Sequence, residues 1–226
     1  METQPQAQSQ PPESGEKSVN MIVYILIGIA ILGVAAFILF PGMKVSNEFT
    51  YKNQAGEPFE FVTGYAGKVP IYTLKVTATY GDKLLKQYEI PLRNKPQELE
   101  AIPVDDEVRQ KILNSRGVFI TMQPELDQKA AIAGIQLAKV LGTADYGIFK
   151  IPVQGAFTLP INTTNTSDYP VKTCQDATPD IRVIILTLGG ENKAYVTADC
   201  VIIKATDEGN LIKVAEAVVL KLLNVL

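Results

Sequence analysis

The stretch MIVYILIGIAILGVAAFILF, residues 21–40, divides the chain. It holds twenty consecutive residues without a charge, an amide or a proline, and Pro41-Gly42 closes it. As a helix rising about 1.5 Å per residue it would be about 30 Å long, the thickness of a bilayer's hydrocarbon core. A soluble helix would show a polar face, and a cleaved signal peptide would show a basic start, a shorter apolar run and a small-residue cleavage site. We therefore expect a retained transmembrane helix over residues 21–41, with residues 21–40 in contact with membrane lipid.

The segment before the anchor, residues 1–20, is rich in glutamine, proline and serine and has no apolar periodicity. Such a composition cannot bury enough apolar surface to offset the entropy of ordering, so it predicts a disordered tail; a docking peptide is the alternative. The tail's acidic residues outnumber its single lysine and account for most of the net charge of −3. The rest of the chain is nearly neutral and has no basic stripe, so we expect no nucleic-acid partner.

Composition also restricts the chemistry. The chain has no histidine and only two cysteines. These counts exclude a structural zinc site and the Ser–His and Cys–His nucleophile pairs. The lone Gly189-Gly190 opens no helix, so it is not a phosphate-binding loop. We expect no catalytic residue, no metal site and no cofactor.

Residues 43–92 predict an antiparallel β subdomain. The clearest strand runs from Ile71 to Tyr80, where apolar and polar residues alternate with a period of two. Gly81-Asp82 supplies a short turn into a return strand. Pro91 has no backbone N–H to donate, so the return strand is expected at an edge of the sheet or to end there.

Residues 93–104, punctuated by two prolines, predict an extended connector, and residues 105–226 predict an α/β subdomain. Its first helix is expected from Asp105 to Asn114, with acidic residues at its start that complement the helix dipole. The remaining elements are predicted as strand 117–122, helix 124–141, and strands 147–153, 181–188 and 194–205. A strand that leads into a helix, as 117–122 leads into 124–141, is typical of βαβ units, so the fold class is α/β (α+β).

The chain is predicted to end in a helix that Thr206-Asp207 caps. One of its faces is apolar at helical spacing: Leu211, Val214, Val218, Leu222 and Val225. The polar residues expected on its wet side are Lys213, Glu216 and Lys221. Its second half is apolar almost all round, which fits a packed closing helix, our preference, or the seam of an oligomer.

The charges that flank the anchor give one indication of topology. Lys17 precedes the anchor, whereas Lys44 and Lys52 follow it, which weakly favours a cytoplasmic C-terminal part. That rule applies to short flanks, and long domains cross the membrane largely regardless of charge.

Two other features favour an extracytoplasmic domain, which is the localisation we expect. Cys174 and Cys200 flank a predicted strand, and a bridge between them would stabilise the fold by about 3–4 kcal/mol; two buried free thiols are the alternative. Asn162 and Asn165 each begin a glycosylation acceptor in one polar loop.

Four stretches together resemble a group of uncharacterised single-pass membrane proteins of archaea, over roughly residues 88–226. They are YEIPLRNKPQELEAIP, GIFKIPV, TCQDATPDIRVIILTLGG and ADCVIIKATDEGNLIKVAEAVVLKLLNVL. The resemblance implies an anchored extracytoplasmic domain with a bridge between Cys174 and Cys200, and it implies no catalytic residue.

These features favour a membrane-anchored binding or assembly module, a subunit of a cell-surface complex, with a protein partner or a second copy of the chain. One alternative is an extracytoplasmic hydrolase that uses the carboxylates of Asp176, Asp180 and Asp199. Another is a pilin-like filament subunit, but the leader that precedes Glu16 is acidic where pilin precursors are basic.

Overall fold

The computed structural model describes residues 47–80, 83–143, 147–160 and 169–226. The chain divides into two units, Met1–Ser46 and Asn47–Leu226. The expected tail and anchor both fall in the first unit, outside the described residues. Both expected glycosylation sites, Asn162 and Asn165, belong to the second unit but also lie outside the described residues. Among the helices of the described ranges, none combines the length and the apolar character that crossing a membrane requires.

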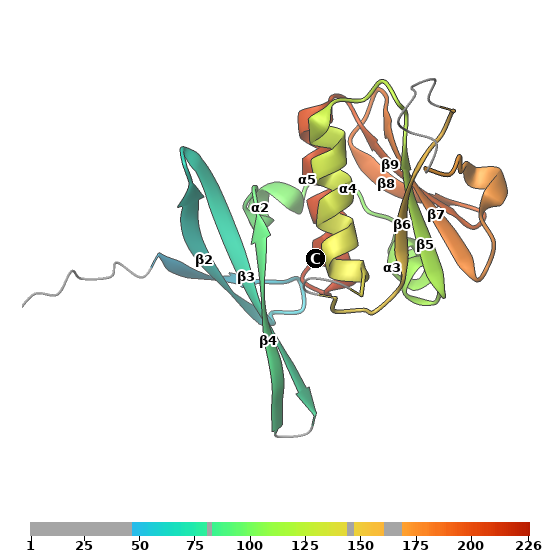
Figure 1. Ribbon diagram of the computed structural model, residues 1–226. Helices are drawn as coiled ribbons and strands as arrows, with labels where there is room; N and C mark the ends of the chain where they lie inside the picture. Colours follow the sequence, from blue (N-terminus) through green and yellow to red (C-terminus); the bar gives the residue numbers. More distant parts are fainter. Residues whose placement is uncertain (1–46, 81–82, 144–146, 161–168) are drawn as a thin grey trace, which may run out of the picture. The chain divides into compact units, whose positions relative to one another are not determined.

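The second unit begins with a four-stranded antiparallel meander (Figure 1). Its strands, in spatial order, are β1 (Glu48–Lys52), β2 (Pro58–Ala66), β3 (Val69–Tyr80) and β4 (Lys83–Leu92). As expected, β4 lies at an edge and contains Pro91. The alternating pattern directs one set of side chains into the core: Tyr51, Phe61, Tyr72, Leu74, Ile90 and Leu92. Aromatic rings tie the first strands together, with the Phe49 and Phe61 rings stacked at 5.3 Å.

The expected extended connector contains a helical turn, α2 (Pro96–Leu99), so this part of the prediction was wrong. Pro96 occupies the start of the helix, where its missing N–H is not needed, and fully buried Leu99 packs into the core. The connector then becomes extended and Val104 forms a parallel bridge with Ala194.

Two predicted helices are present with shorter bounds. The first, α3, spans Asp106–Leu113 with Asp105 at its N-cap. The second, α4, spans Gln128–Leu141 and begins four residues later than predicted. It begins there because the Asp127 side chain accepts a hydrogen bond from the Lys129 N–H and caps the helix.

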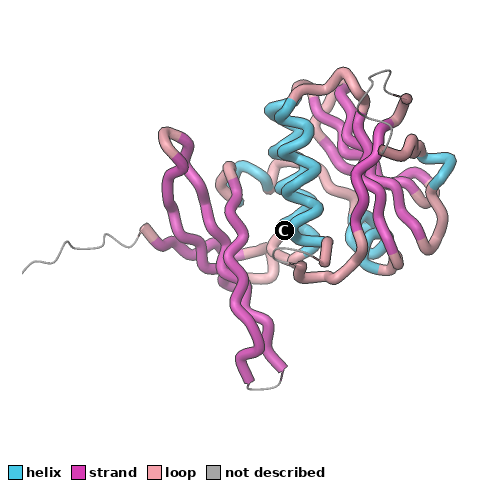
Figure 2. Tube along the Cα trace, viewed as in Figure 1, coloured by secondary structure: helices cyan, strands magenta, loops and turns pink. Residues whose placement is uncertain are grey.

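The C-terminal part contains a mixed five-stranded sheet. Its strands are β5 (Gly117–Met122), β6 (Val153–Phe157), β7 (Ile181–Leu188), β8 (Lys193–Thr197) and β9 (Cys200–Ala205). The spatial order is β6-β5-β7-β9-β8, with every pair parallel except β8–β9. Helices α4 and α5 (Glu208–Leu222) lie side by side on one face of this sheet (Figures 1 and 2).

Two strand predictions were wrong. In the predicted strand 147–153 only Val153 is in β6, because Gly147 and Lys150 adopt left-handed conformations with φ of 50° and 56°. The predicted single strand 194–205 is a hairpin of β8 and β9, and the chain reverses at Ala198, whose φ is 53°.

Helix α5 closes the fold by packing inside the chain. The Asp207 side chain caps it by accepting from the Asn210 N–H at 2.9 Å, as predicted. The residues predicted for its apolar face are all buried in this chain's own core, as expected for a packed closing helix: Leu211, Val214, Val218 and Leu222 within α5, and Val225 just after its end.

One residue of α5 was misassigned. Glu216 was expected on the wet side, yet it is fully buried. Its carboxylate accepts three hydrogen bonds from Arg93 and Asn94, at the end of β4. Burial raises the pKa of Glu216, and the same three donors oppose that shift by favouring the charged form.

Candidate functional site

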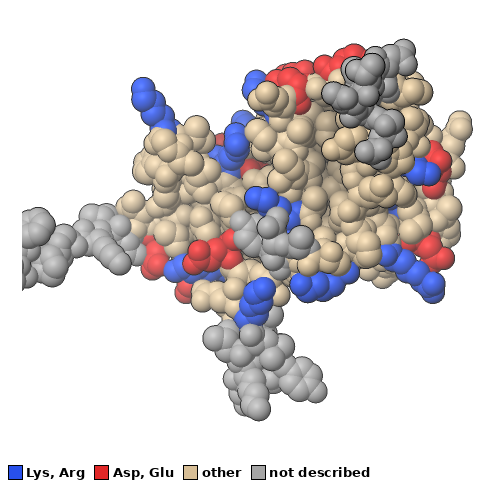
Figure 3. Space-filling model, in the orientation of Figure 1, with Lys and Arg blue, Asp and Glu red and all other residues tan. Residues whose placement is uncertain are grey.

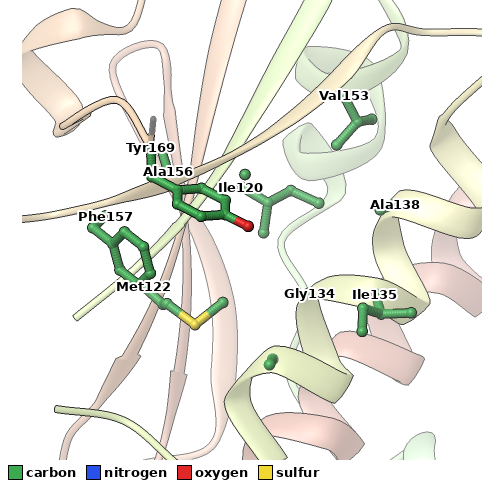
Figure 4. Close-up of a pocket in the computed structure, with 11 residues that line it drawn as sticks. Ile120, Met122, Gly134, Ile135, Ala138, Val153, Ala156, Phe157 and Tyr169 are labelled. Atoms are coloured by element: carbon green, nitrogen blue, oxygen red, sulfur yellow. The ribbon is translucent and has the colours of Figure 1, made fainter. Parts of the chain in front are cut away.

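An apolar groove lies between α4 and the outer strands of the five-stranded sheet (Figure 4). Its volume is about 380 Å³. Its walls come from β5, α4, β6 and Tyr169, which follows β6 in the chain. The lining residues are Ile120, Met122, Ala131, Gly134, Ile135, Ala138, Val153, Gly155, Ala156, Phe157 and Tyr169. None of them carries a charge, so the groove suits an apolar occupant.

Short side chains on α4 open the groove. Ala131, Gly134 and Ala138 recur at helical spacing and line it from the helix side. Opposite them, Met122, Phe157 and Tyr169 point into the same space (Figure 4). The alanine-rich pattern predicted close packing of this helix against a sheet, and at this edge it leaves a hollow instead.

Large apolar side chains flank the groove and contact solvent. Ile135 is 51 % exposed and Tyr169 is 57 % exposed. The Tyr169 ring packs edge-on against Phe157 with centroids 5.5 Å apart. Over α4 and β6 the visible surface is mostly uncharged (Figure 3). A contiguous apolar patch of this kind is typical of a binding surface.

The sheet edge beside the groove offers backbone hydrogen-bonding groups. Phe157 donates its N–H to the Pro170 carbonyl at 3.0 Å and accepts from the Lys172 N–H at 2.9 Å, so both of its groups face away from β5. In a parallel strand the backbone N–H and C=O groups of successive residues point to opposite sides. Val153 and Gly155 are at every second position from Phe157, so their groups also face away from β5. An extended segment could pair with β6 at Val153 and Gly155, next to Phe157, which is already paired with residues 170–172 of the chain.

The expected disulfide is present between Cys174 and Cys200. Cys200 begins β9 and is fully buried, and Cys174 begins a short 3-10 turn before β7. The bridge therefore fastens the loop that precedes β7 to the strand next to it.

The three candidate hydrolase carboxylates each have a different structural partner. Asp176 accepts from the Thr173 N–H at 2.8 Å, and this bond lowers the pKa of Asp176. Asp180 forms an exposed ion pair with Arg116 at 3.4 Å.

The third acid, Asp199, pairs with the buried guanidinium of Arg182 and with Lys111. Burial of Asp199 acts to raise its pKa, but the hydrogen bonds from these two cations prevail and lower it. Among the residues that the structure describes, no three acidic, cysteine or histidine side chains gather as a metal site would require.

Comparison with protein-family models, with curated proteins and with solved structures gives no match for this chain. The functional argument therefore depends on the chain's own geometry. Sequence reasoning missed the groove, although the spacing of Ala131, Gly134 and Ala138 was the available signal.

Proposed function

We propose that the protein is a single-pass membrane protein whose extracytoplasmic domain, residues 43–226, acts as a binding or assembly module in a cell-surface complex. The apolar segment at residues 21–40 supports the anchor. The disulfide supports an oxidising compartment outside the cytoplasm. The resemblance to single-pass archaeal membrane proteins agrees with this proposal.

The apolar groove is the observation that carries the binding function. It combines an uncharged hollow, two exposed flanking side chains and a strand edge with outward-facing backbone groups. Strand addition uses these features together, because backbone hydrogen bonds provide affinity and a side-chain pocket provides specificity. The partner we propose is therefore an extended polypeptide segment that pairs with β6 and inserts an apolar side chain into the groove.

A binding function without catalysis also agrees with the surroundings of the three candidate carboxylates. Asp176 caps a turn, Asp180 holds a surface ion pair and Asp199 neutralises a buried arginine. Because each of these acids has a structural partner, the proposed function assigns them no chemical step.

The test is affinity purification from detergent-solubilised membranes with identification of the co-purifying chains. Ile135→Glu introduces a charge at the groove, whereas Gln128→Glu introduces the same charge on an exposed position of the same helix, outside the lining. We expect Ile135→Glu to lose the partner and Gln128→Glu to keep it. If both variants keep it, the groove is not the binding site.

Topology and self-association need their own measurements. Protease treatment of intact cells should degrade residues 43–226, and protection of this region would contradict an external module. The native mass of the extracted protein shows whether the partner is a second copy of this chain.

A further inference from the structure

The tip of the β2–β3 hairpin stands at one end of the meander (Figure 1), and apolar side chains there are exposed to solvent. Tyr65 is 70 % exposed and Val69 is 44 % exposed, and every residue from Tyr65 to Val69 is exposed. Gly67 makes the reversal with a φ of 65°, and Ala66 pairs with Val69. Nothing in the proposed binding groove involves this tip.

The composition of the tip fits the interface of a bilayer. Between Val62 and Leu74 the only charged residue is Lys68, at the turn itself. Tyrosine is enriched at membrane–water interfaces, and lysine can extend its ammonium group to lipid phosphates while its stem stays among apolar groups. An aromatic, a basic and an aliphatic side chain therefore stand together on one exposed turn.

The chain enters the sheet at the same end as this tip. The Thr63 N–H donates to the Asn47 carbonyl at 2.8 Å, and Glu48 pairs with Val62. Because β1 and β2 are antiparallel, β1 runs away from the tip, whereas β2 continues from Val62 to Ala66, about 13 Å at 3.3 Å per residue.

The connection to the expected anchor is short. Residues 42–46 separate Pro41 from Asn47, and a fully extended chain of this length spans about 20 Å. A tether of this length permits the tip, which lies about 13 Å along β2 from Val62, to reach a bilayer surface.

We propose that residues 65–69 insert into the interface of the same bilayer that holds residues 21–40. Tyr65 and Val69 lie at the boundary between headgroups and acyl chains, and Lys68 contacts the phosphates of anionic lipids. This contact gives the domain a second attachment to the membrane and restricts its orientation. The inference rests on the membrane anchor of the proposed function.

The chain has no tryptophan, so a single introduced indole is an unambiguous reporter. The full chain is reconstituted in phosphatidylcholine–phosphatidylglycerol vesicles with brominated acyl chains, which quench nearby indoles. Tyr65→Trp reports on the tip, and Tyr169→Trp, at a position of similar exposure in the α/β part, is the matched control. We expect at least roughly twofold stronger quenching for Tyr65→Trp, with a blue-shifted emission, because the indole prefers the interface.

A further variant tests the chemistry of the contact. Lys68→Glu with Val69→Asp, added to Tyr65→Trp, should reduce the quenching to the level of the control. Equal quenching at positions 65 and 169 would overturn the inference even when vesicle flotation shows the chain to be anchored. If the chain fails to float with vesicles, the anchor and this inference both fail, whereas the groove experiment remains independent.

Discussion

The Glu216 carboxylate of α5 accepts two hydrogen bonds from Asn94, one from its backbone N–H at 3.1 Å and one from its side-chain amide at 2.8 Å. It accepts a third from the Arg93 N–H at 2.7 Å. The carboxylate is fully buried, and its donors lie where β4 ends. A polar side chain is buried in this way when hydrogen bonds compensate for the lost hydration. This contact holds the end of the meander against the closing helix.

Replacement of Glu216 should therefore weaken folding. Glu216→Ala leaves three donors without their acceptor, and we expect a loss of about 3 kcal/mol in the free energy of unfolding. Glu216→Gln keeps one acceptor oxygen and should cost less. The measurement is denaturant unfolding of the full chain in detergent, with Lys213→Ala on the same helix as control. Equal stability of Glu216→Ala and the wild type would contradict the role of this contact.

The misassignment of Glu216 shows what local patterns miss. Lysines at 213 and 221 make the sequence around it look like a solvated face, and its partners lie more than 120 residues earlier in the chain. Where the signal is local, prediction succeeded: the alternation in β3 and the Asp207 cap are both present.

Other errors have a similar cause. The segment YVTADCVIIK contains β-forming residues on both sides of Ala198, and no glycine marks the reversal there. The groove depends on which strand becomes the outer one, and parallel pairing between distant segments decides that. Residue periodicity does not reveal the reversal at Ala198, and for the groove it offers only the small-residue spacing on α4, which does not say which strand lies opposite.

The disulfide should contribute measurably to stability. Cys174 and Cys200 are 26 residues apart, and closing a loop of that size stabilises a fold by about 3.5 kcal/mol in the chain-entropy model. We expect a reducing agent to lower the melting temperature of the wild type. The double variant Cys174→Ala, Cys200→Ala should melt at the temperature of the reduced wild type, and the reducing agent should not change its melting temperature. A wild type that melts unchanged under reduction would contradict this contribution.

Asp199 and Asp180 should differ in their effect on stability. Asp199→Asn removes the charge that faces Arg182, which is only 5 % exposed, and leaves that guanidinium without its counter-ion. Asp180→Asn removes only a surface pair. We expect Asp199→Asn to melt at a clearly lower temperature than the wild type and Asp180→Asn to melt at the wild-type temperature. Equal melting of the two variants would show that Asp199 has no structural role.

Acid should weaken the start of α5. The backbone hydrogen bond from Asn210 lowers the pKa of Asp207 below its ordinary value, so the folded state favours the charged form. This contribution is complete above the unfolded pKa of about 3.9 and is lost as the pH falls through the lower folded value. Asp207→Asn should therefore show a smaller loss of stability than the wild type between about pH 5 and pH 2, measured by thermal unfolding. Parallel pH profiles for the two proteins would refute this assignment.

Two glycines should respond in opposite directions to the same substitution. At Gly134, in the middle of α4, an added Cβ would meet its nearest neighbour, the Ile120 Cγ2 atom, at 3.4 Å, which is ordinary contact. Because alanine forms helix better than glycine, Gly134→Ala should stabilise the chain by about 0.5–1 kcal/mol. At Gly67 there is open space, but the φ of 65° disfavours a side chain, so Gly67→Ala should destabilise by about 1 kcal/mol. Denaturant unfolding compares both with the wild type. If Gly134→Ala is less stable than the wild type, the space between α4 and β5 is too small for the added methyl group, contrary to the 3.4 Å distance to Ile120.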